Sequence, residues 1–127
     1  MDIDLPDVVA EVKAAFDAYE RALVANDVEA LDAMFHDDPR TIRFGGTESL
    51  FGYAQIQAFR AARSPAGLAR TISNTVITAY GRDVAIATTL FHRTTMPGKV
   101  GRQMQTWVRF PQGWRVVAAH VSVIAEG

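Results

Sequence analysis

Two polar side chains, His120 and Ser122, interrupt an apolar stretch near the end of the chain (GWRVVAAHVSVI). The stretch follows a turn at residues 111–113, so it is predicted to be the second strand of a hairpin. Because side chains alternate along a strand, His120 and Ser122 are expected to share a buried face with Trp114. A buried imidazole and hydroxyl need hydrogen-bond partners, which the polar wall of a ligand pocket would supply. The alternative is a structural histidine beside a surface or interface serine.

Histidine can move protons near neutral pH, and a serine beside it can act as a nucleophile. However, a spacing of two residues on one strand face does not build a triad, and no acidic side chain is evident to orient the imidazole. We therefore expect His120 and Ser122 to line a pocket as polar groups.

Arg43 lies between Ile42 and Phe44 in a short predicted strand at residues 41–44. Its side chain should therefore point to the face opposite to that of its neighbours. If Arg43 points inward, it is a buried cation that must be paired. A substrate carboxylate is one candidate partner, and Glu48 is the internal alternative.

Tyr19 lies one turn beyond Phe16 on the apolar stripe of the first predicted helix. Its hydroxyl can donate a hydrogen bond or a proton to a substrate, or it can bind a backbone carbonyl in the core. Arg60 and Arg63 lie three residues apart on a later helix. They either add positive potential at a pocket mouth or pair in solvent or at an interface.

The composition is typical of a globular protein, with 127 residues, 49% apolar content and a net charge of −1. We expect one domain over residues 1–127, located in the cytoplasm. No apolar run reaches membrane-spanning length, and the acidic N-terminus does not read as a signal peptide. Cysteine is absent, which excludes disulfides and thiolate chemistry.

The near-zero net charge is the sum of two oppositely charged segments. Residues 1–38 hold eleven acidic and two basic side chains, whereas residues 39–127 hold three acidic and eleven basic ones. Ten of these eleven are arginine, whose planar fork suits carboxylates. A site in the later segment would favour a small anionic carboxylate, although most of these arginines can lie on solvated strand edges. Nucleic acid is not an expected partner, because net basic charge and a known binding motif are both lacking.

The sequence predicts neither a metal site nor a nucleotide cofactor. The histidines, His36, His92 and His120, do not have the spacing of metal ligands. The paired glycines, Gly45 and Gly46, lack the context of a phosphate-binding loop.

The order of the predicted elements indicates an α+β fold. Helices are expected at residues 5–25, 28–35 and 53–63, short extended segments at 41–44 and 48–51, and long strands at 68–80, 83–96, 99–110 and 113–124. The long strands are consecutive and antiparallel, so the helices should pack on one face of a curved sheet. Because the other face is also apolar, we expect a homodimer to cover it.

This order of elements, with an inner His-x-Ser on the last strand, resembles the nuclear transport factor 2 superfamily. Its members are cone-shaped domains in which a curved antiparallel sheet wraps around N-terminal helices and encloses a pocket. A narrower resemblance is to the small AtzH-like and HpxZ-like proteins. It is carried by RFGGTESLFG at residues 43–52, FRAAR at 59–63, QTWVR at 105–109 and GWRVVAAHVS at 113–122.

Genes of this family accompany amidases of oxalurate and cyanuric acid catabolism. The resemblance implies a decarboxylating step that converts 1,3-dicarboxyurea, a small dianion, to allophanate. It also implies a catalytic tyrosine on the first helix and a catalytic arginine on the first strand, and Tyr19 and Arg43 hold these positions. We expect substrate binding by Glu48, Arg60, His120 and Ser122.

Two other functions stay open. The chain can be a non-catalytic module that binds a small anion or supports a partner amidase. It can also catalyse proton transfer of the ketosteroid isomerase type, which requires a carboxylate base in the pocket. Glu48 is the acid best placed for that role, and the shortage of acids in the strands counts against it.

Overall fold

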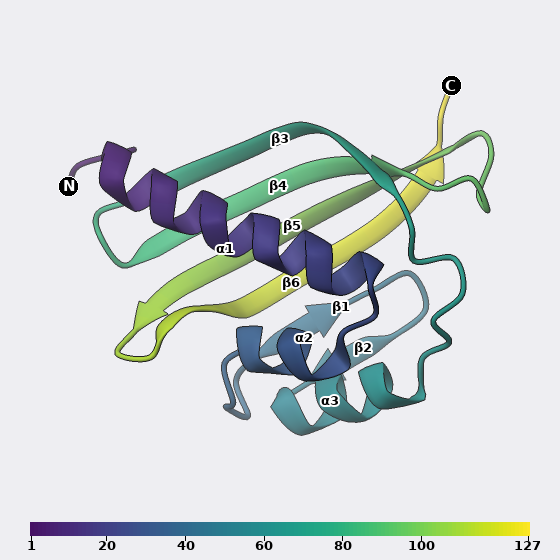
Figure 1. Cartoon of the computed structure of the whole chain (residues 1–127), viewed down its shortest axis with the longest axis horizontal. Helices are drawn as coiled ribbons and strands as arrows, with labels where there is room; N and C mark the ends of the chain where they lie inside the picture. Colours follow the sequence, from purple (N-terminus) through teal and green to yellow (C-terminus); the bar gives the residue numbers. More distant parts are fainter.

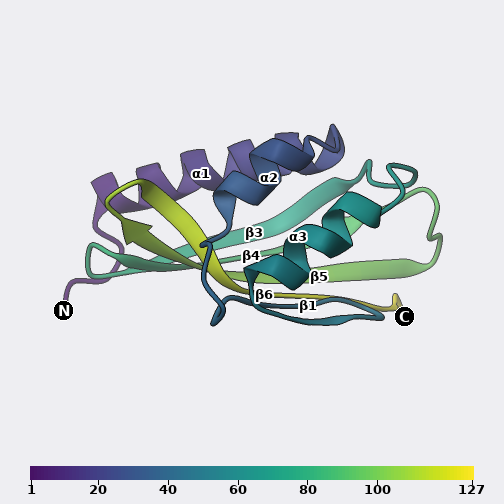
Figure 2. The ribbon, with the colours of Figure 1, turned by 90° about the horizontal axis from the view of Figure 1, so that it is seen from below.

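Three helices pack against one face of a curved six-stranded sheet, and the opposite face is bare (Figure 1, Figure 2). The computed structural model describes all residues from 1 to 127. The helices are α1 (Pro6–Val24), α2 (Val28–Met34) and α3 (Tyr53–Ala62). The strands are β1 (Ile42–Phe44), β2 (Ser49–Phe51), β3 (Thr71–Tyr80), β4 (Val84–His92), β5 (Lys99–Phe110) and β6 (Gly113–Ala125). The predicted α+β class and element order are confirmed.

The strand order across the sheet is β2-β1-β6-β5-β4-β3. The four long strands form an antiparallel meander, as expected from the tight turns between them. The short strand β1 pairs in parallel with β6, so the sheet is mixed rather than wholly antiparallel. This pairing places the β1–β2 hairpin beside the C-terminal half of β6.

An extra residue in β6, Val117, changes which side chains face the helices. Val116 pairs with Trp107, but Ala118 pairs with Thr106, so Val117 has no partner in β5. Such a bulge shifts the alternation of side chains by one position. Trp114 and Val116 are therefore buried before the bulge, whereas Ala119 is buried after it.

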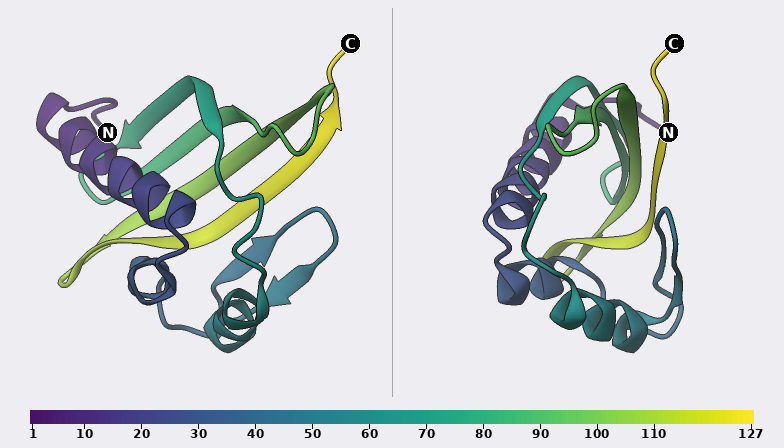
Figure 3. Two further views of the ribbon diagram at one scale, coloured as in Figure 1. Left: turned by 45° about the vertical axis from the view of Figure 1, so that its right-hand side comes forward. Right: turned by 90° about the vertical axis from the view of Figure 1, so that its right-hand side faces the viewer.

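A second irregularity lies in β3 between Ser73 and Val76, where Asn74 adopts a left-handed backbone conformation with φ of 52°. Asparagine tolerates this region better than most residues. Because bulges bend the strands that carry them, the two irregularities curve the sheet around the helical face (Figure 3). The curvature gives the helical face a concave shape.

The core lies between α1 and the concave face. The apolar stripe predicted for α1 is buried, and its most buried members are Val8, Val12, Phe16, Tyr19 and Leu23. Trp107 of β5 is the largest fully buried side chain. Trp114 is buried too, and its indole N–H donates to Glu11 Oε1 at 3.0 Å. Both tryptophans are therefore core residues.

The helix ends follow the expected capping rules. Pro6 occupies the first turn of α1 with Asp7 beside it, where a fixed φ and a negative charge are both favourable. Asp27 caps α2, and its carboxylate accepts a hydrogen bond from the Ala30 amide at 3.2 Å. A helix with the length and apolarity needed to cross a membrane is not found in the chain.

Candidate functional site

Arg43 occupies the middle of β1 and points to the helix-covered face of the sheet. It is in register with the buried Ala119 of β6, and paired residues on neighbouring strands share a face. The Arg43 side chain is 11% exposed, and its Nη1 donates to Glu48 Oε1 at 2.8 Å. The inward orientation, which the sequence left as a condition, is observed, and the internal ion pair with Glu48 is present as well. This pair engages one guanidinium nitrogen.

Glu48 is fixed on the turn between β1 and β2. Its Oε2 accepts hydrogen bonds from the Thr47 amide at 3.2 Å and the Thr47 hydroxyl at 2.9 Å. Burial raises the pKa of Glu48, but the hydrogen bonds from Arg43 and Thr47 outweigh it and leave the pKa below its usual range. The carboxylate lies over Gly45, where an added Cβ would approach Glu48 Oε1 to 1.8 Å. Glycine at this position therefore permits the Arg43–Glu48 pair.

Arg43 and Glu48 form part of the wall of a cavity of about 220 Å³. Arg63, at the end of α3, and Arg93, just beyond β4, also line it. The apolar part of the wall includes Phe59, Leu68, Phe91, Val121 and Val123. Sites for drug-sized ligands usually measure ~300–1,000 Å³, so this cavity suits a smaller molecule.

Two of the cavity arginines have unused donors. Nε and Nη2 of Arg63 and Nε of Arg93 are buried and have no hydrogen-bond partner. A buried donor without a partner typically costs about 1–3 kcal/mol. Burial, followed by the nearby charge of Arg43, lowers the pKa of Arg63. Burial, followed by the charge of Arg70, also lowers the pKa of Arg93.

The other interior arginines are neutralised by carboxylates of the helices. Arg60 is 3% exposed, is ion-paired with Asp32 and lies over the Phe35 ring at 4.7 Å. Arg70 is ion-paired with Glu20. With the Arg43–Glu48 pair, three of the five interior arginines have a carboxylate partner. Arg63 and Arg93 have none, so their positive charges are not neutralised within the chain.

Arg60 was expected either at the mouth of the pocket or paired in solvent or at an interface. Its burial and its bond to Asp32 instead make it a link between α3 and α2. Arg60 does not line the cavity, whereas Arg63, on the same helix, does.

Tyr19 of α1 is 5% exposed and is held by aromatic packing. Its ring lies edge-on to Trp107 and tilted against Phe35, with a centroid distance of 6.3 Å in each case. Tyr19 does not line the 220 Å³ cavity. The structure thus places Tyr19 in the core between α1 and the sheet.

His120 and Ser122 do not face the cavity. The expectation that they share a buried face with Trp114 is wrong, because the Val117 bulge reverses the alternation between them. His120 is exposed, and its ring lies 6.5 Å from the Phe44 ring on the outer face. Ser122 accepts hydrogen bonds from Arg102 at 3.1 and 3.3 Å.

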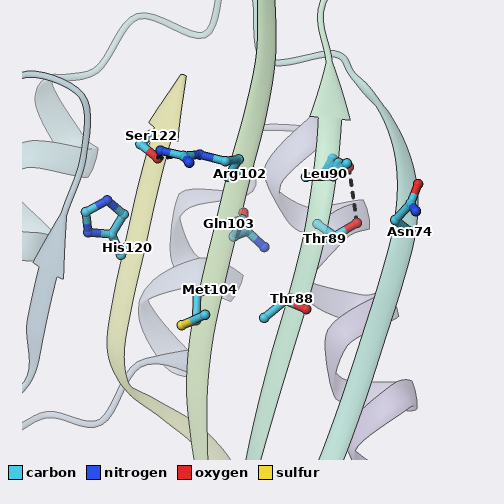
Figure 4. Close-up of a pocket in the computed structure, with 9 residues that line it drawn as sticks. All are labelled: Asn74, Thr88, Thr89, Leu90, Arg102, Gln103, Met104, His120 and Ser122. Atoms are coloured by element: carbon cyan, nitrogen blue, oxygen red, sulfur yellow. Dashed lines mark hydrogen bonds between the residues drawn. The ribbon is translucent and has the colours of Figure 1, made fainter. Parts of the chain in front are cut away.

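His120 and Ser122 instead line an open hollow of about 440 Å³ on the outer face (Figure 4). Arg102 and Met104 of β5 and Thr88 of β4 share this hollow, and α1 lies behind the sheet in this view. Met104 is 55% exposed. The outer hollow and the arginine-lined cavity are therefore distinct, and the arginine-lined cavity is on the concave face.

Reasoning from the sequence missed Arg93. The signal was present, because alternate residues of β4, namely Ala85, Ala87, Thr89 and Phe91, are all buried. Arg93 is next in the same series. A cluster of three or more histidine, aspartate or glutamate side chains suited to a metal is not found in the structure.

The arrangement of helices on a curved sheet defines the class of protein. The chain superposes on a nuclear transport factor 2-like superfamily protein from Salmonella enterica with a TM-score of 0.74, at 24% identity over 91% of this chain and 90% of that one. This likeness shows the fold.

Two solved structures are much more similar. A protein of unknown function of the DUF3225 family from Pectobacterium atrosepticum is 55% identical over 98% of this chain and 96% of its own, with a TM-score of 0.95. A cystatin-like fold protein from Burkholderia xenovorans is 47% identical over 98% of both chains, with a TM-score of 0.94. A match among the curated proteins was not found.

The sequence model of the AtzH-like family matches residues 1–127. The chain therefore belongs to the AtzH-like family, as the motifs around Arg43 and His120 suggested.

Proposed function

We propose that this protein is a cofactor-free enzyme that removes a carboxylate from a small carboxylated urea, converting 1,3-dicarboxyurea to allophanate. The observation that carries the proposal is the position of Arg43, which points into a small cavity whose wall holds two further arginines without carboxylate partners. Membership of the AtzH-like family supports the same reaction class.

In the proposed reaction the bond between a carboxylate carbon and the adjacent urea nitrogen breaks. Carbon dioxide leaves, and the nitrogen takes up one proton to give allophanate. Arg43 holds a substrate carboxylate through charge-assisted hydrogen bonds. By the family resemblance Tyr19 donates a hydrogen bond or the proton to the urea, which requires the urea to extend past the cavity wall toward the Tyr19 hydroxyl, since Tyr19 does not line the cavity. The apolar walls from Phe59, Leu68 and Phe91 exclude water, which strengthens these polar contacts.

The wild-type protein tests the reaction directly. We expect it to accelerate the loss of 1,3-dicarboxyurea and the appearance of allophanate, followed by carbon-13 NMR against the spontaneous reaction in buffer. A protein that leaves this rate unchanged while dicarboxylates raise its melting temperature would instead be a non-catalytic binder or an accessory of an amidase.

We also propose that a second copy of the chain covers the outer face of the sheet. Large apolar side chains are exposed there on four different strands, namely Phe51, Val76, Met104 and Ile124. An apolar face that spans the sheet is costly in a monomer, and a two-fold contact would bury it twice. Light scattering should give the mass of a dimer, and a monomeric mass at micromolar concentration would contradict the dimer.

A further inference from the structure

Three of the five unsatisfied buried polar atoms are N–H donors of residues that line the cavity. They are Nε and Nη2 of Arg63 and Nε of Arg93. Unused donors concentrated in one place indicate a missing acceptor.

The missing acceptor should carry negative charge. Each of Arg43, Arg60 and Arg70 has a carboxylate partner within the chain, whereas Arg63 and Arg93 have none. Two half-buried guanidinium groups in one cavity repel each other unless an anion lies between them. The Arg93 guanidinium also lies over the Phe91 ring at 4.9 Å.

Arg43 already has Glu48 as a partner, and both lie on the β1–β2 hairpin, whereas Arg63 and Arg93 follow the ends of α3 and β4. The cations of the cavity therefore come from different parts of the fold. A ligand with two carboxylates on a short spacer would offer one acceptor to Arg43 and a second to Arg63 and Arg93.

We propose that Arg63 and Arg93 together bind the second carboxylate of a dicarboxylate whose first carboxylate lies at Arg43. The inference rests on the proposed function for the position of the first carboxylate and adds the residues that select for two charges. Arg63 and Arg93 are thus specificity-determining residues.

The test compares two stable ligands of five carbons by calorimetry, glutarate with two carboxylates and pentanoate with one. Glutarate has the same number of atoms between its carboxylates as 1,3-dicarboxyurea. We expect the wild type to bind glutarate at least about tenfold more tightly than pentanoate. In the variants Arg63→Gln and Arg93→Gln the ratio of the two affinities should fall toward one, because these variants bind glutarate more weakly and pentanoate as tightly as the wild type does.

Arg82→Gln is the matched control, since Arg82 pairs with Asp7 on the exposed surface and does not line the cavity. It should retain the wild-type preference. Both cavity variants remove a half-buried cation that has no carboxylate partner, so their melting temperatures without ligand should equal or exceed that of the wild type. This readout distinguishes lost recognition from lost folding.

Two results would overturn the inference. One is an unchanged preference for glutarate in both variants, and the other is an equal loss of affinity for both ligands. The binding assay needs no turnover, so it can be interpreted separately from the proposed reaction. If the preference for glutarate depends on Arg63 and Arg93 but the protein does not convert 1,3-dicarboxyurea, the dicarboxylate site is supported and the proposed reaction is refuted. If the wild type converts 1,3-dicarboxyurea but shows no preference for glutarate, the reaction is supported and the dicarboxylate site is refuted.

Discussion

Replacing Tyr19 with phenylalanine is expected to slow the turnover of 1,3-dicarboxyurea by about a hundredfold or more, with little change in KM. The substitution removes one hydroxyl and leaves the ring packed against Trp107 and Phe35. A positioned proton donor typically contributes ~10²–10⁴-fold to a rate. Steady-state kinetics would show the effect in kcat, since the carboxylate contacts that determine binding remain.

Tyr53→Phe is the matched control for this prediction. The Tyr53 hydroxyl donates to the Asp32 carbonyl at 3.0 Å and does not line the cavity. Its loss should lower the free energy of unfolding by about 1 kcal/mol, as for a typical hydrogen bond, and leave kcat intact. If Tyr19→Phe and Tyr53→Phe behaved alike, Tyr19 would be a core aromatic without a catalytic role.

Replacing Arg43 with alanine is expected to lower kcat/KM at least tenfold to hundredfold. A bidentate contact from arginine to a carboxylate is typically worth about 2–3 kcal/mol, and each 1.36 kcal/mol corresponds to about a factor of ten. The change also leaves Glu48 as an unpaired carboxylate in the cavity wall, which repels an anionic substrate. The double variant Arg43→Ala with Glu48→Gln separates the two effects, because it removes both charges.

Arg102→Gln is the control that tests on which face of the sheet the reaction takes place. Arg102 lies in the outer hollow with Ser122, so its removal should not change turnover if the reaction takes place on the concave face. Wild-type kinetics in Arg43→Ala, combined with a loss in Arg102→Gln, would transfer the site to the outer face.

The sequence could predict that Arg43 points to the face opposite to Ile42 and Phe44, because β1 is short and regular. It could not predict which of these faces the helices cover, because two apolar neighbours are equally consistent with an outward arginine. The helices were clear from the sequence, because the stripe from Val8 to Leu23 follows a single helical period. Local periodicity is sufficient when nothing interrupts it.

His120 and Ser122 could not be placed correctly, because a bulge depends on long-range contacts. The carbonyl of Val116, next to the bulge, accepts a hydrogen bond at 3.0 Å from the amide of His36, a residue far from Val116 in the sequence. After Gly113, the run WRVVAAHVSVI contains no glycine or proline that would mark the extra residue. The pairing of Arg60 with Asp32 was similarly hidden, since 28 residues separate the two side chains.

The bulge at Val117 also divides the side chains of β6 into two sets. Beyond it, Val121 and Val123 border the arginine-lined cavity, while His120 and Ser122 border the outer hollow. A substitution at an odd position there alters the cavity wall, and one at an even position alters the outer face. Deletion of Val117 would exchange the two sets between the faces, so the length of this strand matters as much as its composition.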